Sequence, residues 1–228
     1  MAGPETHAPA QRVCPAAQPD WHTPLVQVPP LEQALPHAPQ ALALVARLVS
    51  HPLAALPSSL GNFGASDFTI AFWLNSTSPA AVSNVLSKRA ACSGGSPYQG
   101  LDLRMGGVAG NLYLEVWTSD AYRGFSTAGV RVNDGQWHHV AIVRQGGALS
   151  INVDGRAAGT NTISGSLADP TATPVYLGVG RCVPGAPGSN GTQDGTAWLN
   201  GRLDEVGFYP RAMSASELSA QAQGLCTQ

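Results

Sequence analysis

The stretch that most constrains the fold of this chain runs from residue 133 to residue 155. Side chains in its first half alternate over 137–144, which predicts a β-strand with two distinct faces. A glycine pair at 146–147 separates this strand from a second one over 149–153, and glycine tolerates the positive φ that tight hairpin turns require. Both faces of the first strand are largely apolar, which indicates a central strand in a two-layer β structure.

The composition supports one β-rich domain. The chain has 228 residues with 26 glycines and 18 prolines, which suits many short antiparallel strands joined by turns. Only 11% of the residues are charged and the net charge is −2, so no broad positive field points to nucleic acid or to an anionic membrane. Single all-β domains often reach this length.

From residue 67 onward, alternation predicts a series of strands. Phe68, Ile70, Phe72 and Leu74 share one face and are expected in the core. Further strands are expected over 85–89, 99–105, 112–118, 175–180 and 203–209, with short ones near Phe125 and Val130. The pattern shows no βαβ alternation and predicts an all-β, two-sheet antiparallel jelly-roll sandwich. A capping-box pattern from Ser214 to Glu217, followed by Gly224, predicts one short C-terminal helix.

The N-terminal region is predicted to differ from the rest. Residues 1–40 contain repeated prolines, which favour an extended segment packed on the domain, and the domain itself is expected over 41–228. Residues 41–56 fit either a short helix or a first strand, and Pro52 ends either element. Because Arg47, His51 and Pro52 interrupt this apolar run, it is too short to span a membrane.

The four cysteines indicate disulfide bonds. They are far apart in sequence and lack the close pairs that zinc sites use. Three connectivities exist, and the favoured one joins Cys14 with Cys226 and Cys92 with Cys182, while four reduced thiols remain the alternative. Disulfides persist in oxidising compartments, so a secreted or cell-surface protein is expected. The first residues do not form a signal-peptide pattern.

Six sequence blocks, taken in order, resemble laminin G-like domains of the concanavalin A-like jelly-roll type that bacterial secreted proteins carry. They lie at 67–73, 85–88, 134–141, 151–155, 175–178 and 199–217. The first 60 residues depart from the usual opening strand of that family. The resemblance implies a two-sheet sandwich whose concave face and rim loops bind glycans or protein partners, and it does not imply catalysis.

The His138-His139 pair is the most tempting catalytic feature. Adjacent strand residues point to opposite faces, so the pair cannot converge on one ion, and the resemblance implies a structural role. Glycoside hydrolases and polysaccharide lyases share this fold, and a hydrolase needs two facing carboxylates. Asp204 and Glu205 should diverge, and Glu115 has no partner identified from the sequence. No catalytic residue is therefore assigned.

Aromatic side chains beside polar groups are the residues expected to bind a glycan. The candidate ligand-binding residues lie in or beside predicted loops and strand ends, and they are Tyr98, Trp117, Tyr122, Arg123, Asn190 and Trp198. Core or rim packing is the alternative for each of them. The candidate cofactor is a structural calcium ion with Asp204 as a ligand, because hard oxygen ligands suit this composition and the resemblance places an acidic residue there.

The sequence therefore favours a non-catalytic recognition module of a secreted or surface protein, with carbohydrate as the expected ligand. Two alternatives remain open at this point. One is an adhesion or assembly domain that binds a protein surface, and the other is a glycan-cleaving hydrolase or lyase. The sequence does not identify the ligand, the parent protein or the oligomeric state.

Overall fold

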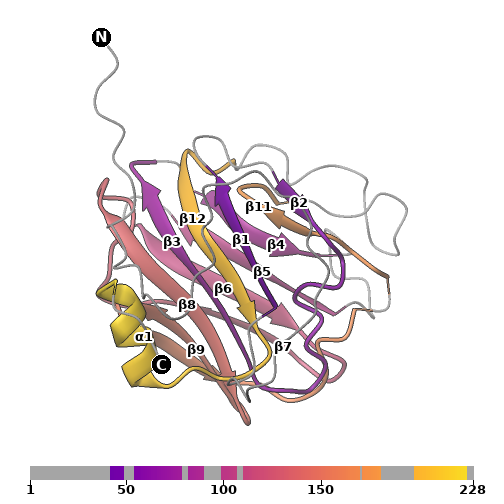
Figure 1. Cartoon of the computed structure of the whole chain (residues 1–228). Helices are drawn as coiled ribbons and strands as arrows, with labels where there is room; N and C mark the ends of the chain where they lie inside the picture. The colour runs from indigo at the N-terminus through magenta and orange to yellow at the C-terminus, as the bar shows by residue number, and fades with distance from the viewer. Residues whose placement is uncertain are drawn as a thin grey trace, which may run out of the picture.

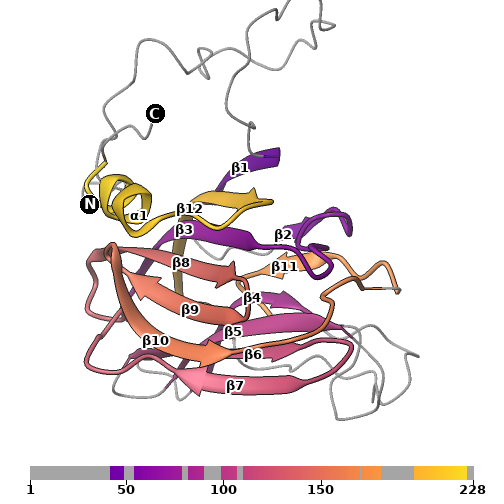
Figure 2. The same ribbon diagram turned by 90° about the horizontal axis from the view of Figure 1, so that it is seen from below.

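The computed structural model describes the backbone of residues 42–48 and residues 54–78, 82–89, 99–106, 110–169, 171–180 and 198–224. Strands in these ranges form two six-stranded antiparallel sheets that pack face to face (Figures 1 and 2). The predicted two-sheet jelly-roll sandwich is confirmed. The Pro-rich segment 1–40 and all four cysteines lie outside the described residues.

The first sheet contains the hairpin that the sequence analysis singled out. Its strands, in spatial order, are β1 (Leu42–Leu48), β12 (Gly201–Tyr209), β3 (Phe68–Ser76), β8 (Trp137–Gln145), β9 (Ala148–Val153) and β10 (Arg156–Thr162). Strand β8 pairs with β3 on one side and β9 on the other, as expected for a central strand. The sequence left a short helix or a strand open for residues 41–56. In the described part of this range the structure has two strands, β1 and β2.

The second sheet carries the short strands and the long β5–β6 hairpin. Its spatial order is β2 (Ala54–Leu56), β11 (Val175–Leu177), β4 (Val82–Lys88), β5 (Gly100–Gly106), β6 (Asn111–Trp117) and β7 (Tyr122–Ser126). The strand expected near Phe125 is β7. Val130 does not lie in a strand, and β11 ends three residues earlier than the predicted range 175–180.

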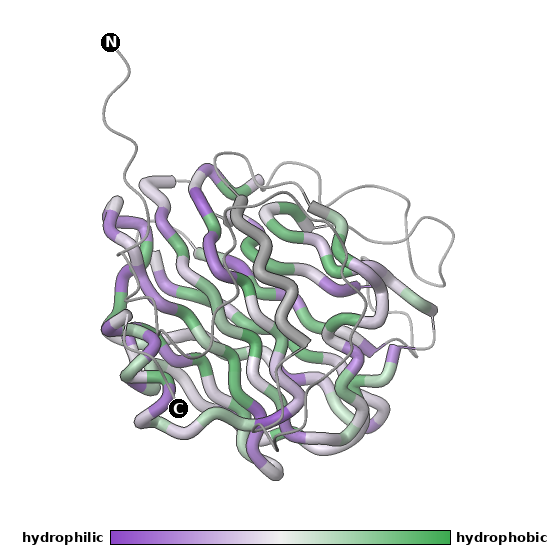
Figure 3. The backbone as a smooth tube through the Cα atoms, viewed as in Figure 1, coloured by the Kyte–Doolittle hydropathy of each residue, from purple (hydrophilic) through white to green (hydrophobic). Residues whose placement is uncertain are grey.

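The core lies between the two sheets, and Figure 3 shows hydrophobic residues recurring along the strands. Phe68, Ile70, Phe72 and Leu74 of β3 are buried in it, which confirms the predicted face. Facing side chains come from alternate residues of the second sheet, namely Leu101, Leu103, Met105, Leu112, Leu114 and Val116. The side chains between these residues in each strand therefore point to the opposite face of the sheet, away from the core.

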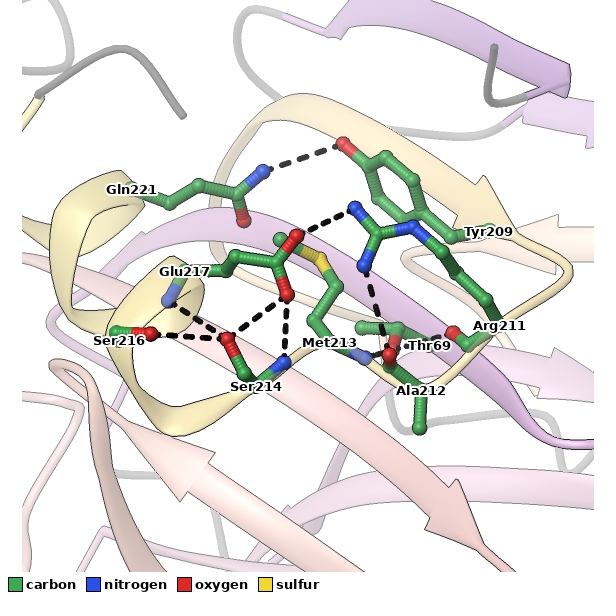
Figure 4. Close-up of polar contacts among 9 residues, drawn as sticks. All are labelled: Thr69, Tyr209, Arg211, Ala212, Met213, Ser214, Ser216, Glu217 and Gln221. Atoms are coloured by element: carbon green, nitrogen blue, oxygen red, sulfur yellow. Dashed lines mark hydrogen bonds and ion pairs between the residues drawn. The ribbon is translucent and has the colours of Figure 1, made fainter. Parts of the chain in front are cut away.

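Helix α1 (Ala215–Ala222) covers the outer face of the first sheet (Figures 1 and 2). Leu218 and Met213 pack there against Ala71, Ala141 and Val143. The predicted capping box is present, because the Ser214 amide donates to Glu217 Oε2 at 2.7 Å and the Glu217 amide donates to Ser214 Oγ at 3.3 Å (Figure 4).

The segment that precedes α1 is tied to β3 by one hydroxyl group. Thr69 Oγ1 donates to the Arg211 carbonyl and accepts from the Met213 amide, both at 2.9 Å (Figure 4). Arg211 also forms a 2.7 Å ion pair with Glu217, which lies in the first turn of the helix. This network and the apolar contacts fix α1 on the first sheet. The outer face of the second sheet lies on the opposite side of the molecule from this helix (Figure 2).

Candidate functional site

The outer face of β5, β6 and β7 gathers charged and aromatic side chains on residues that alternate with the core. Together with Arg89, which follows β4, they are called the outer face below, and its members are Arg89, Asp102, Arg104, Tyr113, Glu115, Trp117 and Tyr122. Strand register places Asp102 opposite Glu115, Arg104 opposite Tyr113 and Trp117 opposite Tyr122. Directly opposite residues are close enough for their side chains to interact.

Charges on the outer face are paired with one another. Arg104 lies between the two carboxylates, with its Nε 3.2 Å from Asp102 Oδ2 and its Nη2 in an ion pair with Glu115. Arg89 Nη1 is also 3.2 Å from Asp102 Oδ2, and the Asp102 side chain is fully buried. Two guanidinium groups therefore balance two carboxylates, and the pairs hold the long arginine side chains in place.

Aromatic rings extend this network. Trp117 and Tyr122 have ring centroids 5.4 Å apart, and the Arg89 guanidinium lies 4.9 Å from the Trp117 ring centroid. The Tyr122 hydroxyl donates to Glu115 Oε1 at 2.9 Å, and its oxygen lies 3.2 Å from that of Tyr113. Tyr122 is 47% exposed. The result is an aromatic surface beside groups that can exchange hydrogen bonds with hydroxyl groups.

This arrangement does not suit glycoside hydrolysis. The structure supplies the carboxylate neighbour of Glu115 that the sequence did not identify, namely Asp102. Asp102 is inaccessible to a substrate because it is fully buried. A hydrolase needs two carboxyl groups that both reach the glycosidic bond, and of these two only Glu115 has any exposed side-chain surface.

The structure brings together two of the six residues predicted to bind ligand, Trp117 and Tyr122. Trp198 is 43% exposed but lies elsewhere, because the Leu199 amide donates to the Gly178 carbonyl just beyond β11. Strands β4 and β5 separate β11 from β6. Tyr98 and Asn190 lie outside the described residues.

Arg123 holds two parts of the backbone together. Its Nε donates to the Thr162 carbonyl on β10 at 3.1 Å, and its Nη1 donates to the Tyr122 carbonyl at 2.8 Å. The Ala128 amide donates to the Ala158 carbonyl nearby. Together with this backbone bond, the Arg123 side chain joins the edges of the two sheets. Its donors point to the backbone rather than to the Trp117–Tyr122 pair.

Comparisons with known proteins agree with this architecture. Residues 51–219 match the family described as the concanavalin A-like lectin/glucanases superfamily. The chain belongs to this family. A search of curated protein sequences found no match.

Several solved structures share the superfamily fold. The CBM40 domain of the Ruminococcus gnavus IT-sialidase is 18% identical with a TM-score of 0.59, and the match covers 78% of this chain and 98% of that one. The same domain has been solved with α2,3-sialyllactose, at 16% identity, a TM-score of 0.58 and coverage of 78% and 97%. Domain 4 of AbnA, an extracellular arabinanase from Geobacillus stearothermophilus, was solved with arabinotriose, at 15% identity, a TM-score of 0.56 and coverage of 81% and 82%.

In this member of the superfamily, the adjacent histidines point to opposite faces of β8, as predicted. His139 is buried between the first sheet and α1, where its ring lies edge-on to Trp73 with centroids 5.4 Å apart. Burial lowers the pKa of His139 to about 4, against weaker opposing contributions from Gln221 and Asp154. The side chain is therefore neutral at pH 7 and belongs to the packing beneath the helix.

His138 lies on the other face, at the end of the sandwich. Its Nδ1 is 2.8 Å from Asp154 Oδ2 and its Nε2 is 3.1 Å from Asp134 Oδ1. The Asp154 carboxylate, followed by Asp134, raises the pKa of His138 despite partial burial. His138 and His139 therefore cannot act on one substrate atom or one metal ion.

Asp204 lies on β12 opposite Trp73, and its Oδ1 accepts a hydrogen bond from the Glu205 amide at 2.9 Å. Within the described ranges of this superfamily member, no group of three or more His, Cys, Asp or Glu side chains is placed to hold a metal ion. Calcium binding at Asp204 thus remains a prediction. No helix in the same ranges combines the length and apolar character needed to cross a membrane.

Proposed function

We propose that the chain is a non-catalytic carbohydrate-recognition module that binds a neutral glycan on the outer face of β5–β7. The observation that carries this proposal is the ring pair formed by the half-buried Trp117 and the exposed Tyr122, directly beside Glu115. Aromatic rings pack against the C–H faces of sugars, while carboxylate and hydroxyl groups orient sugar hydroxyls. The sialyllactose-bound and arabinotriose-bound structures support a carbohydrate ligand in general, and of these two sugars arabinotriose is the neutral one.

The balance of charge favours a neutral sugar. Both arginines of the outer face are already engaged by Asp102 or Glu115, so an acidic sugar would compete with existing ion pairs for the guanidinium groups. Glu115 would also repel a ligand carboxylate. A neutral glycan needs only to share the donors and acceptors at the rim of this network.

The module would act in a secreted or cell-surface protein. One structural relative is described as part of an extracellular arabinanase, and glycans accessible to such modules are outside the cell. Only 11% of the residues are charged, and this composition does not point to a nucleic-acid partner.

A direct test measures binding of neutral oligosaccharides and their sialylated counterparts on a glycan array, followed by calorimetry with the strongest neutral ligand. Trp117→Ala and Tyr122→Ala should each weaken binding about tenfold or more, because each removes ring contact with the sugar. Trp198→Ala, a change at an exposed tryptophan beyond β11, should leave affinity unchanged.

Three outcomes would contradict the proposal. Absence of binding to any glycan, with retained binding to a protein surface, would favour the adhesion alternative. Loss of binding in Trp198→Ala but not in Trp117→Ala would place the site at the β11 end of the sheet. Release of new reducing ends or unsaturated products from a polysaccharide would establish an enzyme instead.

A further inference from the structure

A pocket lies at the end of the sandwich, and its lining contains none of the outer-face residues. It has a volume of about 570 Å³ and lies between the 128–131 segment, the start of β8 and the β9–β10 turn. Pockets of this size accommodate small molecules. None of the seven outer-face residues lines the pocket, so a ligand here would not depend on the proposed glycan site.

The carboxylate at the rim of this pocket already has partners. Asp154 Oδ2 lies 2.8 Å from His138 Nδ1, and Asp154 Oδ1 accepts from the His139 amide at 2.9 Å. The nearby Asp134 Oδ1 accepts from the Gln136 amide at 2.9 Å and lies 3.1 Å from His138 Nε2. A carboxylate therefore lies at each ring nitrogen of His138, and these contacts, with Asp154 first, raise the pKa of its side chain.

Two guanidinium groups in the pocket have no such carboxylate. Arg131 Nε donates to Asn133 Oδ1 at 2.7 Å, and the buried Asn133 is itself anchored through its Nδ2 to the Ser78 carbonyl at 2.9 Å. Arg156 lies at the start of β10 and is exposed. Among the residues that the structure describes, neither arginine forms an ion pair.

The carboxylates near the pocket have a histidine partner, whereas its arginines have no carboxylate partner. Asp134 and Asp154 both contact His138, and the guanidinium groups of Arg131 and Arg156 are without an ion pair among the described residues. Two guanidinium groups without a carboxylate partner can be expected to attract an anion. A guanidinium group presents two parallel N–H donors, and their spacing matches the two oxygens of a carboxylate.

The same pocket also has an apolar lining. Val130 and Val153 contribute to it, with alanines from the adjoining segments. An apolar surface beside guanidinium groups that have no ion pair is suited to a ligand with a charged end and an apolar body.

We propose that this pocket binds a small organic carboxylate, whose charged group is held by Arg131 and Arg156 and whose apolar part packs on Val130 and Val153. The carboxylate takes the donors that the protein leaves without an ion pair. The His138–Asp154 contact orders the β9–β10 turn that forms one wall of the pocket.

The probe is benzoate, with benzamide as a neutral molecule of similar shape, each titrated into the whole chain labelled with ¹⁵N and followed by two-dimensional NMR. Benzoate should produce saturable shifts in the amide signals of Val153, Arg156 and Ala157. Benzamide should bind about tenfold more weakly, because it lacks the charge. Arg131→Gln and Arg156→Gln should each weaken benzoate binding by a similar factor.

Arg211→Gln is the matched control, because it removes one positive charge at α1, on the outer face of the first sheet. It should leave benzoate affinity unchanged, which separates contact with the ligand from a general change in net charge. Equal affinity for benzoate and benzamide, unchanged binding in folded Arg131→Gln and Arg156→Gln, or shifts that do not saturate would each overturn the proposal. Unchanged amide spectra away from the substituted residue verify that each variant is folded.

Discussion

The hydroxyl oxygens of Tyr113 and Tyr122 lie 3.2 Å apart, although the two residues are not paired in register across β6 and β7. They meet beside Gly124, which lies opposite Glu115 on the edge strand. A Cβ atom at this position would overlap both hydroxyl groups. The absence of a side chain at residue 124 is therefore what allows the two tyrosines to form one continuous surface with Glu115.

Gly124→Ala should displace both tyrosine side chains and weaken glycan binding about tenfold, with little change in the free energy of unfolding. Gly106→Ala is the matched control, because its Cβ would meet no atom closer than 3.8 Å. Calorimetry with the neutral glycan and thermal unfolding measure the two effects separately. Unchanged affinity in a folded Gly124→Ala variant would show that the tyrosine hydroxyls do not contribute to the site.

Stability should fall in acid because of His139. Its folded-state pKa of about 4 is below the ordinary value near 6.5, so the unfolded chain takes up the proton first as the pH falls. This contribution is complete above pH 6.5 and is lost between pH 6.5 and 4, with an upper limit of about 3 kcal/mol. Denaturant unfolding at a series of pH values measures it.

His139→Phe keeps an aromatic ring against Trp73 but removes the titration, so its stability should depend less on pH in that window. His138→Asn should have the opposite effect on the pH profile. The raised pKa of His138, due first to Asp154, gives stability that is present in acid and lost as the pH rises through the folded-state pKa. A His139→Phe profile that matches the wild type would contradict the assignment.

Lys88 should be among the most sensitive positions for stability. Its buried Nζ donates to the Ser58 carbonyl at 2.8 Å and the Thr173 carbonyl at 2.7 Å, and it lies 3.9 Å from Asp169 Oδ2. Lys88→Met should lower the free energy of unfolding by about 3 kcal/mol, because it leaves these oxygens without their donor. Leu101→Met, at the paired position on β5, should cost less than about 1.5 kcal/mol. Equal losses in the two variants would refute the role of the ammonium group.

The predicted disulfides, Cys14 with Cys226 and Cys92 with Cys182, can be tested chemically. Mass spectrometry of peptides from the unreduced protein should recover both cross-linked pairs. Cys14→Ser should then reduce the free energy of unfolding by about 2 to 5 kcal/mol, through loss of a cross-link. Four free thiols in the exported protein would exclude the pairing and weaken the argument for an oxidising compartment.

Calcium binding at Asp204 predicts a melting temperature that depends on the metal. A ligand that binds only the folded state at 100 times its Kd adds about 2.7 kcal/mol of stability. Calcium should therefore raise the melting temperature of wild-type protein previously treated with a chelator, and Asp204→Asn should reduce the shift. Identical melting curves with chelator and with excess calcium would argue against a tight site.

Much of the fold could be predicted because burial leaves a mark on alternate residues, as in Phe68 to Leu74. Strand β10 was not predicted, since Arg156–Thr162 is a polar edge strand that obtains its pairing from β9. The helix was predicted because capping is local in sequence, with Ser214 and Glu217 three residues apart.

Only part of the outer face could be predicted in this way. Trp117 and Tyr122 stand out as aromatic residues near a turn, but the Asp102–Glu115 relationship depends on register between two strands. Gly106 pairs with Asn111, and the same register places Asp102 opposite Glu115 four residues along each strand. The placement of Trp198 beyond β11 depends on tertiary contacts that no local pattern reports.

The alternation of β5, β6 and β7 separates two requirements that often conflict in a binding protein. Leu103 and Leu114 fill the interior, while their neighbours Arg104 and Glu115 point away from it and are partly exposed. Single substitutions at partly exposed outward residues such as Tyr113 or Trp117 can therefore change the chemistry of this surface while the packing between the two sheets stays the same.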